Sequence, residues 1–320
     1  MVLEEIRDSS GDVKVDALGN VLFTSIGRGR RRQRVMVDAH MDEVGFMIVA
    51  EDGDGLYEFT TIGGLDARGL PGRQVVVGGR HVQGVIGTKP IHLMKEGDLK
   101  KTIELDSLRI DLGPGGKVEI GARGTFAPNF MRVGPSVMSK ALDNRLGVAI
   151  LLALVQEAQP NMDLLAAFTV QEEVGLRGAQ VAAKYFDPDL AIVVDATPAR
   201  DLPVRHEGDN TFYNSRLGLG PAIYVSNRTA IDDPRLVRHM ISTAERARIP
   251  HQIRQPGTGG TDAGAIQMAL EGVPVVSVSV PNRHPHTAMS VARIEDWRNT
   301  HALISAALHR LTPRVLKQSI

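Results

Sequence analysis

The 320-residue chain contains no cysteine. This absence excludes disulfide bonds, thiolate nucleophiles and metal sites built on cysteine sulfur. Any metal that the protein binds must therefore be held by histidine and carboxylate side chains, and the chain has ten histidines and 37 acidic residues from which to build such a site.

Neither sign of charge is in excess, because 37 Lys and Arg residues balance 37 Asp and Glu residues. A chain without net charge has no global field that would attract nucleic acid or an anionic membrane surface. The composition therefore predicts no nucleic-acid partner and no membrane partner.

Long hydrophobic runs are also missing. The longest clean apolar run, Leu146 to Val155, has ten residues, about half of the ~20 that a membrane-spanning helix needs, so it predicts a buried helix segment. The first residues, Met1 to Glu5, are partly acidic and lack the apolar core of a secretory signal. From these features we expect a cytoplasmic protein.

Several familiar catalytic and nucleotide-binding motifs are absent. The chain has no Gly-x-Ser-x-Gly nucleophile elbow, no phosphate-binding Gly-x-x-x-x-Gly-Lys-Ser/Thr loop and no His-Glu-x-x-His zinc motif. The glycine-rich stretch from Gly257 to Gly264 does not fit the Gly-x-Gly-x-x-Gly spacing, and no strong strand precedes it. Nicotinamide-dependent chemistry is therefore not indicated.

Glycine is unevenly distributed along the chain. Residues 43–132 hold 17 of the 33 glycines. Short β-type stretches at 45–50, 74–77 and 82–86 alternate there with Gly-Gly, Pro-Gly and Asp-Gly turns, a pattern typical of a compact β-barrel or sandwich. With a length suited to one large or two ordinary domains, the chain is expected to carry residues 42–132 as an inserted β-rich domain.

The remainder alternates buried strands with helices, which predicts an α/β fold with a mostly parallel sheet sandwiched by helices. Residues 1–41 and 133–320 would form this α/β domain. The expected strands are 34–39, 164–170, 190–194, 222–226 and 274–280, and the expected helices are 143–158, 175–186, 233–248, 261–271 and 295–311.

Ionisable residues follow four of these strands. Three strands are followed by His40, by the pair Glu172 and Glu173, and by Asp195, and the last strand is followed after a short loop by a histidine, His284 or His286. Ligands of open α/β sheets bind at this carboxyl edge. Each residue alone has an ordinary explanation as a core histidine or a solvated turn acid, but burying so much charge together without a counter-charge is unfavourable.

Metal is the natural counter-charge for this cluster. Asp143, at the start of a predicted helix, would be an ordinary helix cap alone but adds a further carboxylate here. Two histidines and three carboxylates suit Zn²⁺, Co²⁺ or Mn²⁺. Five ligands exceed the three of a catalytic zinc and fit two metals, ~3.5–4 Å apart, sharing one carboxylate and activating water. Hydrolysis is the chemistry implied.

Two local spacings refine this site. Asp42 lies two residues after His40, so in extended backbone both side chains face the same way and Asp42 can orient the imidazole. The adjacent Glu172 and Glu173 point in opposite directions, so that one can bind metal while the other acts as a general base.

Taken together, these motifs resemble the M42 metallo-aminopeptidases, which include glutamyl, lysyl and deblocking aminopeptidases and tetrahedral assemblies. The similarity runs in family order from residue 16 to about residue 312. The matching stretches are Asp38–Gly45, Ala141–Arg145, Thr169–Gly175, Val193–Asp195, Gly259–Ala263 and Val280–Thr287.

The resemblance implies a role for each candidate. His40 and Asp195 would hold one divalent metal and Glu173 and His286 the other, with zinc or cobalt as the expected ions. Asp143 would bridge the metals, Glu172 would be the base on the metal-bridging water, and Asp42 would orient His40. Family structure further implies a cis peptide between Asp143 and Asn144.

The resemblance also implies partners. The inserted domain would mediate dimerisation, and dimers would build a hollow tetrahedral dodecamer whose inner active sites take short peptides. Family members usually carry a helix and a Ser-Gly-x-Glu segment before the stretch matching Asp16–Asn20, where fifteen residues stand here, so a chain shorter by about one helix is expected.

Three functions therefore follow from the sequence in order of preference. The first is a dinuclear-metal aminopeptidase that removes the N-terminal residue from short peptides. The second is a non-catalytic metal-binding or peptide-binding protein of the same fold, which would have no need of Glu172. The third is a glycoside hydrolase, which would use paired carboxylates without metal.

Overall fold

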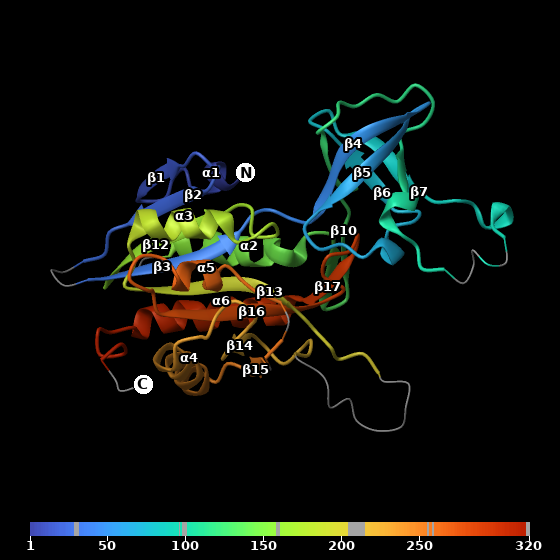
Figure 1. Ribbon diagram of the computed structural model, residues 1–320. Helices are drawn as coiled ribbons and strands as arrows, with labels where there is room; N and C mark the ends of the chain where they lie inside the picture. The colour runs from blue at the N-terminus through green and yellow to red at the C-terminus, as the bar shows by residue number, and fades with distance from the viewer. Residues whose placement is uncertain are drawn as a thin grey trace.

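The computed structural model combines an α/β sandwich with a β-barrel that projects from one end of it (Figure 1). The chain passes into the barrel after β3 (Gln33–His40) and returns to the sandwich at β10 (Phe130–Val133). The residues described are 1–28, 32–95, 97, 101–157, 161–203, 215–254, 256–257 and 259–317.

Four parallel strands form the centre of the sandwich sheet, in the spatial order β12 (Met162–Thr169), β3, β13 (Leu190–Pro198) and β16 (Val275–Arg283). Every residue of β12 is buried, and β13 and β16 are buried except at their last residue. The near-continuous hydrophobic runs in the sequence reflect this double-sided burial. All four central strands were predicted, with ends that differ by a few residues.

Antiparallel strands flank this parallel centre on both sides, so the sheet is mixed. Short connections join three of these antiparallel pairs, and a short connection cannot make the crossover that parallel pairing requires. The strands are β1 (Asp12–Val15) and β2 (Val21–Ser25) on one side, and β17 (Ser290–Arg293), β11 (Ser136–Ser139) and β10 on the other. The predicted strand at 222–226 is the short β14 (Ala222–Tyr224), which pairs with β16 and with β15 (Gln252–Arg254).

Helices cover both faces of this sheet. On one face, α2 (Leu142–Gln156), α4 (Pro234–Ala247) and α6 (Ile294–Arg310) bury their apolar sides in the larger core, which also receives residues of α1 (Val2–Glu5). On the other face lie α3 (Arg177–Phe186) and α5 (Ala263–Gln267). The helix predicted at 261–271 is only five residues long. None of the helices in the described part of the chain has both the length and the apolar character to cross a membrane.

The barrel is a closed ring of six antiparallel strands. Its core contains Phe46, whose ring packs edge-on against Phe59 and Phe126 with centroids 5.3 and 5.2 Å away. The β10 strand, although all but its last residue lie within 42–132, belongs to the main sheet. In ring order the strands are β4 (Gly45–Gly53), β5 (Leu56–Ile62), β8 (Arg109–Asp111), β7 (Val82–Gly87), β6 (Gln74–Val77) and β9 (Arg123–Phe126). Single-turn helices lie at Ala67–Gly69, Ile91–Leu93 and Leu105–Ser107.

A close approach of α3 to the end of β12 positions the segment that follows this strand. The buried Asn20 accepts a hydrogen bond from the Val170 amide at 2.9 Å and donates one to the Gly178 carbonyl at 3.0 Å. A Cβ atom at Gly178 would lie 2.3 Å from the Val170 oxygen and 2.4 Å from Asn20 Oδ1. Only glycine therefore fits at this contact.

We predict that Gly178→Ala destabilises the protein by ~1–3 kcal/mol or more, the usual range for an overpacked contact. The measurement is urea unfolding followed by circular dichroism. Gly69→Ala is the matched control, since a Cβ there meets no atom within 4 Å. Equal unfolding midpoints for the two variants would contradict the packing described for Gly178.

Candidate functional site

The structure brings the predicted site residues together near the carboxyl ends of the central strands. His40 is the last residue of β3, and Glu172 and Glu173 follow β12. Asp195 lies inside β13, because this strand continues to Pro198 instead of ending at residue 194. The remaining two come from different elements: Asp143 lies in the first turn of α2, and His286 lies in the loop after β16.

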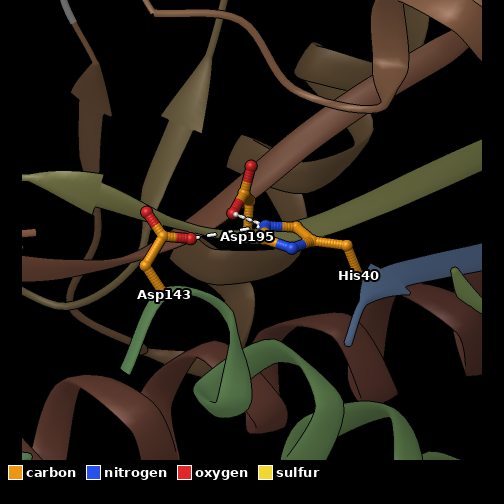
Figure 2. A group of neighbouring side chains, drawn as sticks. All are labelled: His40, Asp143 and Asp195. Atoms are coloured by element: carbon orange, nitrogen blue, oxygen red, sulfur yellow. Dashed lines mark ion pairs between the residues drawn. The ribbon is translucent and has the colours of Figure 1, made fainter. Parts of the chain in front are cut away.

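The first cluster consists of His40, Asp143 and Asp195 (Figure 2). The Nε2 atom of His40 lies 3.3 Å from Asp143 Oδ1 and 3.5 Å from Asp195 Oδ1. The three side chains come from a strand, a helix start and a second strand, and their ligand atoms all lie within 4.8 Å of one another. A nitrogen and two carboxylate oxygens in this arrangement can hold one divalent cation.

The second cluster consists of Asp143, Glu173 and His286. The Nε2 atom of His286 lies 3.3 Å from Glu173 Oε1 and 3.5 Å from Asp143 Oδ2, and the three ligand atoms again lie within 4.8 Å of one another. Asp143 thus directs one carboxylate oxygen to each cluster. Of the two histidines that spacing left open, both are exposed, and His286 is the one whose ring reaches Asp143 and Glu173.

Each histidine ring is oriented through its other nitrogen. His40 Nδ1 lies 3.2 Å from the Asp42 carbonyl oxygen and 3.6 Å from Asp42 Oδ1. His286 Nδ1 lies 2.9 Å from the carbonyl oxygen of Gly64, which follows the barrel strand β5. These contacts turn both Nε2 atoms toward the carboxylates, as metal-ligating histidines require. The role of Gly64 was missed, because a backbone carbonyl leaves no signal in the sequence.

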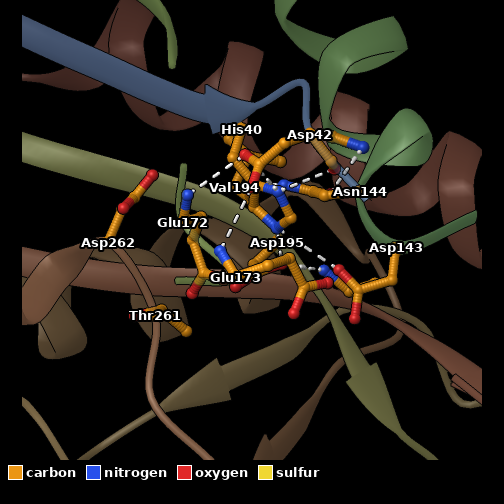
Figure 3. A network of polar contacts seen from close by, with 12 residues as sticks. His40, Asp42, Asp143, Asn144, Glu172, Glu173, Val194, Asp195, Thr261 and Asp262 are labelled. Carbon is orange, nitrogen blue, oxygen red and sulfur yellow. Dashed lines mark hydrogen bonds and ion pairs between the residues drawn. The ribbon is translucent and has the colours of Figure 1, made fainter. Parts of the chain in front are cut away.

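Asp42 also supports the acidic pair. Its two carboxylate oxygens accept hydrogen bonds from the backbone amides of Glu172, at 3.1 Å, and Glu173, at 3.2 Å (Figure 3). Burial acts to raise the pKa of Asp42, but His40 and these two amides outweigh it and lower the pKa. Asp42 therefore stays ionised and holds the backbone of both glutamates in place.

The acids of the site carry strongly shifted pKa values. Burial raises the pKa of Glu172 to about 9, with the nearby carboxylates of Asp195 and Glu173 adding to the shift and His40 opposing it. Burial likewise raises the pKa of Asp195 to about 6. For Asp143, burial is outweighed by His286 and His40, which hold its pKa well below the usual range.

Burial and the neighbouring acids also shift the pKa of the histidine His286. Burial alone would lower the pKa of His286, but Asp143 and Glu173 raise it to about 11. The carboxylates of this site thus draw positive charge to it. A divalent cation supplies such charge, and the oxygen and imidazole donors present here are those that Zn²⁺ and Co²⁺ accept. The residues therefore fit a pair of divalent metal ions.

The peptide bond between Asp143 and Asn144 is cis, as the family resemblance implied. Asn144 is fully buried, donates a hydrogen bond to the Val194 carbonyl at 2.8 Å and accepts one from the Gly147 amide at 3.0 Å. These contacts tie the start of α2 to β13 beside Asp195. From the sequence, Asn144 was expected only as a partner in the cis peptide; these hydrogen bonds, which connect the elements that carry Asp143 and Asp195, were not predicted.

Both clusters open into a cavity of about 680 Å³, a size that suits a small-molecule or short-peptide ligand. Glu172 lines this cavity together with His40, Glu173 and His286. Further lining comes from Tyr224, Arg228, Arg254, Gly259 and Gly260. The Gly259–Ala263 motif thus lies partly in the cavity wall, and its Asp262 accepts a hydrogen bond from Thr169 at 2.8 Å.

Comparison with known proteins identifies the family. The model of the M42 glutamyl aminopeptidase family matches residues 19–303. Lysyl aminopeptidase of Pyrococcus furiosus is 33% identical over 98% of this chain and 91% of its own length. A TET aminopeptidase from a marine-sediment Thaumarchaeota archaeon superimposes with a TM-score of 0.92 at 32% identity, covering 99% of this chain and 92% of its own.

A further solved relative is the TET1 peptidase of Pyrococcus horikoshii, which is 33% identical and has a TM-score of 0.84, with 97% of this chain and 92% of that chain covered. It is described as assembling into a tetrahedron or a large octahedral shell. The match therefore extends over nearly the whole chain in sequence and in fold. The chain belongs to the M42 family of aminopeptidases and is a peptide hydrolase.

Proposed function

We propose that the protein is a dinuclear-metal aminopeptidase that removes the N-terminal residue from short peptides. The observation that carries this proposal is the position of Asp143 between two histidine-carboxylate clusters, with one oxygen directed to each. A shared carboxylate is the arrangement that a pair of metals requires.

His40 and Asp195 would hold one divalent cation, Glu173 and His286 the other, and Asp143 both. Zinc or cobalt suits this donor set. When bound, two such ions lower the pKa of water and polarise a peptide carbonyl.

Glu172 is the general base in this proposal. It lines the cavity, and among the described residues its carboxylate makes no ion pair that would commit it to a structural role. It takes a proton from the attacking water and passes it to the departing amine, while Asp42 keeps its backbone fixed. Burial raises the pKa of Glu172 in the metal-free protein, and the positive charge of bound cations would lower it again, so that the ionised carboxylate can accept the proton.

The two other functions fit these contacts less well. A glycoside hydrolase needs two carboxylates free to act as acid and as base or nucleophile. Here Asp143, Glu173 and Asp195 each lie within 3.5 Å of a histidine Nε2 atom, which suits metal ligands. A protein that only binds metal or peptide has no use for a further acid, Glu172, beside the ligand Glu173.

The proposed metal binding predicts that single substitutions weaken different numbers of metal sites. Titrating the metal-stripped protein with Zn²⁺ in a calorimeter should show two sites per chain. Asp195→Ala and His286→Ala should each weaken one site, whereas Asp143→Ala should weaken both because its two oxygens face both clusters. Asp66→Ala, on the exposed barrel surface, is the control. If Asp143→Ala keeps two unchanged sites, Asp143 is not shared.

The division of labour between adjacent glutamates gives a second prediction. Glu172→Gln should lower kcat on aminoacyl-nitroanilides by about 10²–10⁴, the usual contribution of a general base, with metal content unchanged. Glu173→Gln should reduce metal occupancy together with activity. Near-normal activity of Glu172→Gln, or equal metal loss in both variants, would show that the assigned roles are wrong.

Assembly gives a third prediction. We propose that the inserted domain, residues 42–132, mediates dimerisation, and that dimers build a tetrahedral dodecamer with inward-facing active sites that admit only short peptides. The assembly described for the TET1 relative supports this. Light scattering at micromolar concentration should give twelve times the chain mass. A monomeric mass would contradict the proposal.

A further inference from the structure

A second cavity, of about 520 Å³, lies where the barrel meets the sandwich. It is separated from the active-site cavity by the segment 171–177, whose residues line the two cavities in turn. Glu172, Glu173, Gly175 and Leu176 line the active-site cavity, and Gln171, Val174 and Arg177 line the second one. The segment 171–177, which contains the proposed base Glu172, therefore forms a wall between the two cavities.

Two guanidinium groups from different parts of the fold line this second cavity. Arg123 belongs to the barrel strand β9, and Arg177 is the first residue of α3. Within the described part of the chain, neither side chain makes a hydrogen bond or an ion pair. Both are therefore available to a ligand.

The two carboxylates that line the same cavity are already engaged. Asp42 accepts hydrogen bonds from the backbone amides of Glu172 and Glu173. Glu43 accepts the Thr125 hydroxyl at 2.9 Å and pairs with Lys140. The charge left without a partner in this cavity is therefore positive.

We propose that this cavity is a binding site for a small anion, with Arg123 and Arg177 as its charged contacts. The planar guanidinium fork matches the oxygens of carboxylate and phosphate groups, so the ligand carries one of these. The cavity volume lies in the range of small-molecule sites. The ligand bridges the barrel and the sandwich.

Occupancy of this site changes the reactivity of the active site, a part of the inference that rests on the proposed function. The shared segment contains two non-glycine residues in the left-handed region, Gln171 at φ 63° and Leu176 at φ 57°, and such positions carry strain. A ligand that holds Arg177 restrains the backbone of Glu172 and Glu173. Any such coupling is reciprocal, so active-site ligands would alter anion affinity equally.

Binding is tested first, by a readout that needs no catalysis. The metal-stripped full-length protein is titrated in a calorimeter with inorganic phosphate and, separately, with L-glutamate, which distinguishes the two ligand chemistries. We expect one saturable site per chain for at least one probe. Arg123→Gln/Arg177→Gln should weaken it about tenfold or more, and each single variant less, whereas Arg246→Gln on the exposed surface of α4 should leave it unchanged.

The outcomes separate clearly. Absence of binding by both probes up to about 10 mM, or equal affinity in wild type and in a folded double variant, overturns the site. The single variants decide the question if circular dichroism shows that the double variant does not fold.

Coupling is tested next on the zinc-loaded enzyme. A saturating probe should change kcat or KM at least about twofold in wild type and leave both unchanged in the double variant, which keeps basal activity. Binding without a kinetic change overturns the coupling alone. Binding by a protein that shows no peptidase activity overturns the proposed function and leaves the site standing.

Discussion

The site depends on one carboxylate that contacts two imidazoles. Asp143 places its two oxygens 3.3 and 3.5 Å from the Nε2 atoms of His40 and His286, and Asp195 and Glu173 each contact one of the same two imidazoles. Without positive charge, carboxylates buried this closely repel one another, and burial makes that repulsion costly. Burial and the neighbouring carboxylates raise the pKa values of Glu172 and Asp195 for this reason. The rest of the structure keeps these groups close together despite their repulsion.

The barrel contributes directly to this support. Its strand β5 leads into Gly64, whose carbonyl orients His286. Glu43, next to Asp42, accepts a hydrogen bond from Thr125 of the barrel. It also forms an ion pair with Lys140, which lies just before α2. The inserted domain is thus mechanically connected to both clusters. A ligand or a second chain that shifts the barrel would act on the same residues that position the acids.

The core of the fold follows from short-range patterns in the sequence. Four strands buried on both faces read as continuous hydrophobic runs, and the Gly-rich turns between short β stretches indicate the barrel. The helix predicted at 261–271 is too long, because only Ala263–Gln267 is helical and the chain turns over residues 268–271, where Leu270 has a φ of 55°. The antiparallel edge strands were not predicted, since a strand of four exposed residues such as β1 or β10 lacks the continuous hydrophobic run that marks the buried central strands.

The sequence by itself determined which chemistry is available. Absence of cysteine restricted metal ligands to histidine and carboxylate, and strand-end positions gathered His40, Asp195 and the glutamate pair at one edge, because parallel strands end on the same side. Tertiary structure alone decided which groups meet across long separations. It placed the Gly64 carbonyl against the ring of His286, and it brought the Asp42 carboxylate to the backbone amides of Glu172 and Glu173, about 130 residues away in the sequence. Such contacts depend on how loops return to the sheet, and backbone carbonyls and amides are the same at every position of a sequence.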